Sequence, residues 1–305
     1  MPSQWPALVY DDWSATCDTL HAHTQVLGKL AVALAPPEPQ LQHAALRLTA
    51  RGWETLPLPR PDGSGSFVAC LDLLTHEFVV DISDRRRLTY SLVDRSVGDV
   101  TRQMLLGIRA QVGSFEVAMN PQEVPWTVPF DQDEEHATYI PEQVDTYFAC
   151  ATQAALALAA FRAPFRGRST PVNAWWGSFD LAVNLFSGLP AAPPSEDFIM
   201  RNAMDAQEVA VGWWPGDPRY GRAAFYAYAH PAPDHFSDGA LSPAAARWEP
   251  ELGEFVLDWE DIRSASDPHA RAVEFARSAF RHACFVCDWD SALSASAEGD
   301  PPPVV

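Results

Sequence analysis

Apolar residues recur at helical spacing in four long segments of the chain. In the first, residues 11–35, the recurring positions form one stripe, which predicts an amphipathic helix. The same spacing predicts helices over residues 96–112, 141–163 and 267–287. The stretch "APPEPQ" follows the first helix and should end it, because proline cannot continue a helix.

Short runs of alternating apolar and polar residues lie between these helices and predict β-strands. They form two groups, namely residues 45–52, 66–74, 77–83, 87–93 and 114–119, and then residues 172–187, 207–214, 223–230 and a hairpin over 246–259. Helix, strands and helix therefore occur twice in order. This order predicts an α+β fold of two similar halves, each an antiparallel sheet with flanking helices, with a cleft between the halves.

The same order predicts the domain boundaries. Residues 1–120 should form the N-terminal α+β half and residues 141–290 the C-terminal α+β half. Residues 121–140 are rich in proline and acidic residues, which favours an extended connector whose aromatic residues still pack. Residues 291–305 are polar and end in prolines, and we expect a disordered tail there.

The segment 173–188, "NAWWGSFDLAVNLFSG", carries the main functional hypothesis. Read as one strand over residues 175–186, its odd-numbered residues are apolar and require a core. Its even-numbered face carries a carboxylate, Asp180, with Ser178 and Asn184 as polar neighbours and Trp176 near one end. Such a carboxylate either contacts water or lines a pocket, because burial without hydrogen-bond partners is prohibitive. The aromatic residues on this face favour the pocket.

Three other segments carry side chains suited to chemistry. The candidates are His21, Gln25 and Lys29 along the edge of the first helical stripe, Arg51 in "LTARG", Trp214 in "GWWPG", and Tyr226, Tyr228 and His230 on one face of "FYAYAHP". An arginine can bind a substrate carboxylate through two hydrogen bonds. A solvent-exposed helix flank and sheet face remain the alternative interpretation of these residues.

Charge and composition narrow the possible partners. The net charge is −19 with 21 Lys+Arg, so we expect neither nucleic acid nor a membrane as a partner. No signal peptide or membrane-spanning run is recognised. The chain has five cysteines, an odd number without the spacing of a disulfide framework, which indicates a reducing, cytoplasmic location. Phosphate-binding glycine loops, nucleophile-elbow motifs and H-E-x-x-H do not occur, and the C-x-x-C pair Cys284 and Cys287 has no second ligand pair for zinc. We therefore expect no metal and no cofactor.

Several motifs resemble those of the bacterial family of unknown function DUF5996: "LHAHTQVLGKLAVALAPP", "LTARG", "WWGSFDLAVNLFSG", "GWWPG", "FYAYAHP" and "ELGEF". The similarity covers roughly residues 4–290. The residues that match the family pattern are His21, Gln25, Lys29, Arg51, Ser178, Asp180 and Glu208. The pattern has histidines where this chain has Asn173 and Gln207, and an arginine in place of Leu185. If usual members hold a metal through those histidines, the resemblance implies that this chain has lost it and has a changed pocket in specialised biosynthesis.

Together these features predict a cofactor-independent enzyme that binds a small metabolite of aromatic or amino-acid-like character in an aromatic-walled cleft. Asp180 would be the general base or amine anchor, His230 or His21 a proton shuttle, and Arg51 or Lys29 a carboxylate clamp. The other expected binding residues are Gln25, Asn173, Trp176, Ser178, Asn184, Glu208, Trp214, Tyr226 and Tyr228. Cyclisation, isomerisation, elimination or hydrolysis would fit, in a monomer or homodimer. The alternatives are a non-catalytic ligand-binding or protein-interaction module, and a metal-dependent enzyme.

Overall fold

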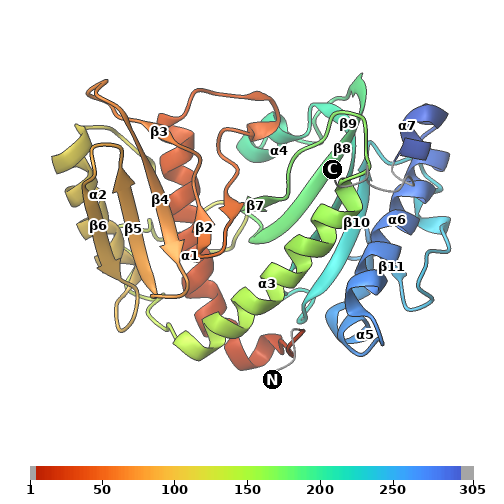
Figure 1. Cartoon of the computed structure of the whole chain (residues 1–305), viewed down its shortest axis with the longest axis horizontal. Coiled ribbons are helices and arrows are strands. Elements are labelled where there is room, and N and C mark those ends of the chain that lie inside the picture. The colour runs from red at the N-terminus through yellow and green to blue at the C-terminus, as the bar shows by residue number, and fades with distance from the viewer. Residues whose placement is uncertain (1–4, 297–305) are drawn as a thin grey trace, which may run out of the picture. The chain divides into compact units, whose positions relative to one another are not determined.

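The computed structural model describes residues 5–296 and confirms the α+β class (Figure 1). The chain divides into two compact units, which are described separately. The N-terminal unit contains Asp11–Phe148 and Ala174–Phe179. The C-terminal unit contains Ala149–Asn173 and the described residues of Met1–Tyr10 and Asp180–Val305. Each unit thus combines segments that are distant in sequence, whereas the sequence pattern suggests two continuous halves.

The four long helices lie where helical spacing predicts them: α1 (Tyr10–Leu34), α2 (Val97–Val112), α3 (Pro141–Arg162) and α6 (Pro268–Val286). The pattern does not predict the short elements, which are α4 (Phe198–Ala203), α5 (Trp259–Arg263), α7 (Ser291–Ser296) and the 3-10 turns η1 (Pro39–Leu41) and η2 (Phe236–Asp238). Helix α7 occupies the start of the segment expected to be a disordered tail, so that expectation is wrong there. The rest of the predicted tail, 297–305, lies outside the described residues.

The sheet of the N-terminal unit is antiparallel. Its strands are β1 (Arg47–Leu48), β2 (Gly52–Glu54), β3 (Leu58–Pro59), β4 (Ser66–Asp72), β5 (Glu77–Ile82) and β6 (Arg87–Ser91). They pair in the order β1-β2-β4-β5-β6, with β3 beside β4, and α2 packs against β5 and β6 (Figure 1). A strand expected over 114–119 does not form. The carbonyl of Phe115 there accepts from the Arg109 side chain at 3.1 Å, and that of Met119 accepts from the backbone N–H of Phe130 at 2.9 Å.

The sheet of the C-terminal unit is also antiparallel. Its strands are β8 (Asp180–Pro190), β9 (Ala206–Trp214), β10 (Ala224–His230), β11 (Arg247–Glu249) and β12 (Glu254–Asp258). They pair in the order β11-β12-β10-β9-β8, with β7 (Asn173–Trp175) at the end of the path. In register, Tyr226 on β10 lies opposite both Gly212 and Val256.

The segment expected to be one strand over 175–186 is interrupted. Trp176–Phe179 form a turn, and β8 starts at Asp180. The odd-numbered residues of β8 are buried as predicted, since Leu181, Val183 and Leu185 are fully inaccessible. The even-numbered residues from Asp180 to Phe186 are buried as well, so this part of β8 does not alternate between core and solvent.

The odd-numbered face of this sheet is covered by helices of the same unit. Phe225 stacks on Trp259 of α5, and Phe255 meets the ring of His282 of α6 edge-on. Helix α6 packs along β9 and β10 (Figure 1). Since neighbouring residues of a strand point to opposite faces, the even-numbered face, which contains Asp180, is directed away from these helices.

Candidate functional site

The predicted site residues fall into two groups, one in each unit. The C-terminal unit holds Asn173, Asp180, Asn184, Glu208, Trp214, Tyr226, Tyr228 and His230. The N-terminal unit holds His21, Gln25, Lys29, Arg51, Trp176 and Ser178. Each group is therefore a separate candidate site.

A tyrosine–carboxylate pair lies at the centre of the even-numbered sheet face in the C-terminal unit. The hydroxyl of Tyr226 donates a hydrogen bond to the Asp180 carboxylate, and both side chains are buried. A Cβ atom at Gly212 would lie 2.3 Å from the Tyr226 ring, so glycine is required for the ring to cross β9 toward β8. Burial, and then the charge of Asp180, raise the pKa of Tyr226 well above its usual value. The phenol therefore stays protonated and remains a donor.

A second carboxyl group, Glu254 on β12, lies near this pair. Burial raises its pKa to about 8, and the neighbouring Asp180 carboxylate contributes to the increase. A carboxyl group that burial keeps protonated beside a second carboxyl group is a typical acid/base arrangement. At neutral pH Glu254 therefore holds a proton. The sequence interpretation missed this residue, although the parity of Glu254 with Val256, the register partner of Tyr226, places it on the same face.

Asn184 and Glu208 form another buried polar pair on this face. Burial raises the pKa of Glu208 to about 8, although a hydrogen bond with the Asn184 side chain opposes the shift. The Asn184 Oδ1 atom has no hydrogen-bond partner among residues 5–296. His230 lies opposite Glu208 in register, and its Nε2 is 3.0 Å from the carbonyl oxygen of Ala192, to which it can donate. This pair thus adds a second protonated acid and one orphaned acceptor to the face.

Aromatic rings form a row beside these polar groups. Trp214 contacts Tyr226 at a ring-centre distance of 5.6 Å, and Tyr226 lies parallel to Tyr228 at 6.2 Å. Tyr220 extends the row at 5.3 Å from Trp214, and its hydroxyl donates to Asp258 at 2.5 Å. The predicted aromatic residues of this unit therefore pack against one another. Asn173 is fully buried at the start of β7.

In the N-terminal unit, His21 stabilises the turn at 176–179. Its Nε2 lies 3.0 Å from the carbonyl oxygen of Trp176 and 2.9 Å from that of Gly177, so this nitrogen carries the proton and donates. The Gln25 amide nitrogen is 3.2 Å from the same atom and, being a donor too, makes only a contact there. Burial lowers the pKa of His21 to about 4, so the ring is neutral at pH 7. This geometry supports a structural donor more than the expected proton shuttle.

The turn ends at Phe179, whose φ of 57° lies in the left-handed region that non-glycine residues rarely adopt. Three rings hold it there. Phe179 stacks on His21 at 5.0 Å, on Tyr147 at 5.2 Å and on Trp53 at 5.3 Å. Strain of about 1–3 kcal/mol at such a residue persists only where the surroundings determine its position. The aromatic stack provides those surroundings.

Gln25 and Lys29 follow His21 along α1 and contact the connector. The Gln25 side chain pairs with the backbone of Gln122 in both directions, at 2.8 Å and 3.0 Å. Lys29 Nζ donates to the Gln122 side chain at 3.2 Å and lies 5.4 Å from the centre of the Trp176 ring. Gly28 permits this arrangement, since a Cβ atom there would lie 2.1 Å from the Trp176 ring.

Two predicted residues of this unit have other roles or positions. Arg51 binds an internal carboxylate, that of Asp72, with its Nε 2.9 Å from Oδ2. Because this guanidinium already has a carboxylate partner, its expected role as a substrate clamp has no support. Ser178 is exposed within the turn.

The connector also contributes a histidine–carboxylate pair that the sequence interpretation missed. His136 Nδ1 lies 2.6 Å from Oδ2 of the buried Asp133, and the His136 ring is 4.3 Å from that of Trp126. Burial by itself would lower the pKa of His136, but the hydrogen bond and charge of Asp133 outweigh it and raise that pKa. No periodicity marks these residues. The only sequence signal is a histidine after the acidic run "DQDEE".

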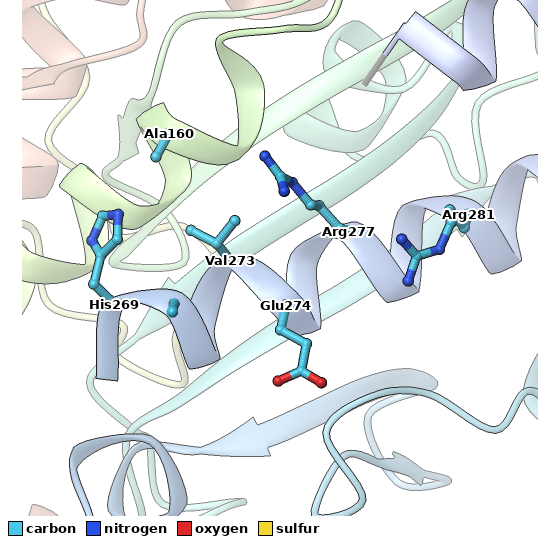
Figure 2. A pocket seen from close by; sticks show the side chains of 7 residues that line it. Ala160, His269, Val273, Glu274, Arg277 and Arg281 are labelled. Atoms are coloured by element: carbon cyan, nitrogen blue, oxygen red, sulfur yellow. The ribbon is translucent and has the colours of Figure 1, made fainter. Parts of the chain in front are cut away.

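A surface hollow of about 450 Å³ lies elsewhere, between α3 and α6. Figure 2 shows Val273 and Arg277 directed from α6 toward Ala160 of α3, whereas Glu274 points away. None of the predicted site residues lines it. Helix α6 covers the odd-numbered sheet face, so the hollow and the Asp180 carboxylate lie on opposite sides of the sheet. We place the candidate site at the sheet face, because the paired acid and base groups lie there.

Two general features bear on metal and membrane binding. Residues 5–296 contain no group of three or more histidine, cysteine, aspartate or glutamate side chains arranged to hold a metal ion. Helix α3 (Pro141–Arg162) is long and apolar enough to span a membrane by length and composition. The core helix of a soluble protein passes the same test, so α3 is weak evidence for a membrane span.

These observations define the class as an α+β protein with two antiparallel sheets, one of which carries buried carboxyl groups and aromatic rings on the face opposite its helices. The chain belongs to the family of unknown function DUF5996, whose model matches residues 5–296. The resemblance seen in its motifs is thereby confirmed. Comparison with curated proteins and with solved structures gave no significant match.

Proposed function

We propose that this protein is a cofactor-independent enzyme that carries out acid/base chemistry on a small metabolite at the even-numbered face of the C-terminal sheet. The observation that carries the proposal is the Tyr226–Asp180 hydrogen bond beside Glu254, whose pKa of about 8 keeps it protonated at neutral pH. Asp180 would accept a proton or bind an amine, and Glu254 would return the proton. Its expected location is the cytoplasm.

The walls of this site indicate the substrate class. Trp214, Tyr226 and Tyr228 offer ring faces for an aromatic group, and Asn184 offers an orphaned buried acceptor for an N–H or O–H donor. An aromatic amine or amino-acid-like metabolite satisfies both features. Proton transfer between Asp180 and Glu254 fits isomerisation, elimination, cyclisation or hydrolysis.

An untargeted turnover assay tests this proposal. A bacterial small-molecule extract is incubated with the protein in a buffer that contains a chelator, without added cofactor, and followed by mass spectrometry. We expect at least one metabolite to be consumed, and an Asp180→Asn variant to consume it at least about tenfold more slowly, equivalent to ~1.4 kcal/mol in the barrier. A thermal melt confirms that the variant is folded.

The assay also separates the alternatives. If wild type and Asp180→Asn consume the same compound at the same rate, Asp180 has no catalytic role. If a compound binds to wild type without being converted, the protein is a ligand-binding module. Turnover that appears only when the chelator is omitted would indicate a metal-dependent enzyme. Each of these results contradicts the proposal.

A further inference from the structure

Lys29 is the only lysine in the 305-residue chain, and every other basic residue among its 21 Lys+Arg is an arginine. This single lysine is 6% exposed, on the buried side of α1. It therefore adds little positive charge to the surface, and arginine side chains supply that charge elsewhere in the chain. A primary amine at this position calls for a separate explanation.

The surroundings of Lys29 leave most of its hydrogen-bonding capacity unused. An ammonium group has three donors, and Nζ donates one hydrogen bond, to the neutral Oε1 of Gln122 at 3.2 Å. The buried Trp176 ring lies beside the amine, with its centre 5.4 Å from Nζ. Among residues 5–296, no carboxylate lies within ion-pair distance of Nζ. Burial without a counter-charge lowers the pKa of Lys29 from 10.5 to about 8, and no charged side chain contributes to this shift.

Arginine could not replace this amine chemically. A guanidinium stays charged and offers no lone pair, whereas a desolvated lysine becomes a nucleophile near neutral pH. Gln25 holds the backbone of Gln122 from both sides, which fixes the acceptor next to Nζ. The Lys29 amine is thus positioned by the neutral Gln122 amide, next to the indole ring of Trp176.

We propose that Lys29 is a carbonyl-reactive residue that forms an imine with a small uncharged aldehyde or ketone, whose apolar or aromatic group contacts Trp176. Uncharged carbonyl compounds fit best. No ionised side chain of the described residues acts on Nζ, so none is at hand to neutralise a charged substrate. This site belongs to the N-terminal unit and does not depend on the function proposed for the C-terminal sheet.

The bond changes balance without a cofactor. The lone pair of the neutral amine attacks the carbonyl carbon, the C–N bond forms, and the carbonyl π electrons move to the oxygen. A proton then passes from the positively charged nitrogen to this oxygen through water, which gives a carbinolamine. Loss of the hydroxyl as water then leaves the imine, so amine and aldehyde become imine and water. Gln122 Oε1 can accept a hydrogen bond from the amine N–H during attack, which makes Gln122 a positioning residue.

Reductive trapping tests the proposal. The folded full-length chain is incubated with benzaldehyde and sodium cyanoborohydride at pH 7.5. The borohydride supplies the hydride and water the proton that convert the imine into a stable benzylamine. Intact-mass measurement and peptide mapping then locate the product. Besides Lys29 the chain has one other amine, its amino terminus, so the assignment is unambiguous.

We expect one benzyl group on Lys29, attached roughly a hundredfold faster than to Nα-acetyl-lysine amide, because a pKa of about 8 instead of 10.5 leaves far more neutral amine at pH 7.5. The rate should reach half its plateau near pH 8. Pyruvate, a carbonyl compound with a carboxylate, should react more slowly. Lys29→Arg and Lys29→Met should lose the adduct, and Asp180→Asn should retain it.

Other outcomes overturn the proposal. Labelling of Lys29 only after urea denaturation would make it a buried structural residue. A rate no faster than that of the model amide would exclude an activated amine. Preference for pyruvate over benzaldehyde would contradict the uncharged substrate class. Because the mapping is done on wild-type protein, the result holds even if a Lys29 variant fails to fold.

Discussion

Replacing Tyr226 by phenylalanine tests whether the Asp180 carboxylate depends on the tyrosine hydroxyl. The substitution keeps the ring that lies over Gly212, so neither a cavity nor a clash is created. It removes the one donor that Tyr226 offers to Asp180, which is 4% exposed. A hydrogen bond to a charged group contributes about 1.5–3 kcal/mol, and loss of a partner leaves the buried group desolvated. The free energy of unfolding should therefore fall by about 1.5–3 kcal/mol.

Urea unfolding at pH 7 measures this difference through the midpoint at constant slope. Tyr90→Phe is the matched control, because it removes a partly exposed hydroxyl for which residues 5–296 provide no hydrogen-bond partner. It should change stability by less than about 0.5 kcal/mol. If Tyr226→Phe is as harmless as Tyr90→Phe, the hydrogen bond carries no net stability and the argument for a buried, tyrosine-dependent carboxylate fails.

Two further predictions concern buried titratable groups. His23 is fully buried and neither ring nitrogen has a hydrogen-bond partner among the described residues, so His23→Leu should stabilise the protein at pH 7 by about 1–3 kcal/mol. The pKa of His23 in the folded protein is about 3, below the usual 6.5, so wild type loses stability as the pH falls from 6.5 toward 3. Urea unfolding at pH 7 and at pH 5 should therefore show a smaller loss of stability for His23→Leu than for wild type. The pKa of Glu208 is about 8 in the folded protein and 4.5 for an ordinary glutamate, so wild type loses stability as the pH rises from 4.5 to 8. Glu208→Gln should therefore be more stable than wild type at pH 8 by about 1–4 kcal/mol. Equal stability of wild type and Glu208→Gln at pH 8 would show that Glu208 ionises freely in the folded protein.

The sequence predicts the long helices and most strands because their apolar residues repeat without interruption. The alternation of side chains along a strand also predicts that Asp180 and Tyr226 point away from the helix-covered core. The prediction carries across the sheet because even-numbered residues of β8, β9 and β10 lie opposite one another. The turn at 176–179 escapes prediction for a physical reason. Apolar residues continue to alternate through it, and the left-handed conformation of Phe179 depends on rings from distant segments.

In the N-terminal site, the sequence predicts the positions of the side chains but not their partners. Helical spacing places His21, Gln25 and Lys29 on one side of α1, and all three are buried. Their partners cannot be inferred from local pattern, because Gln122 is 93 residues from Lys29 and lies in a connector without periodicity. The same reason explains why the Asp133–His136 pair was missed. Irregular backbone positions side chains through individual hydrogen bonds, and a pattern analysis does not detect these.

The placement of Phe179 also sets the order in which the N-terminal unit can be completed during synthesis. When the ribosome has added Arg162, all six strands of the N-terminal sheet exist, but Ala174, which exchanges both backbone hydrogen bonds with Leu46, and Phe179 do not. Trp53 and Tyr147 then lack the Phe179 ring that stacks on both. The unit therefore matures only after the chain has entered the C-terminal unit and returned. To produce the N-terminal unit by itself, one would have to join residue 148 directly to residue 174.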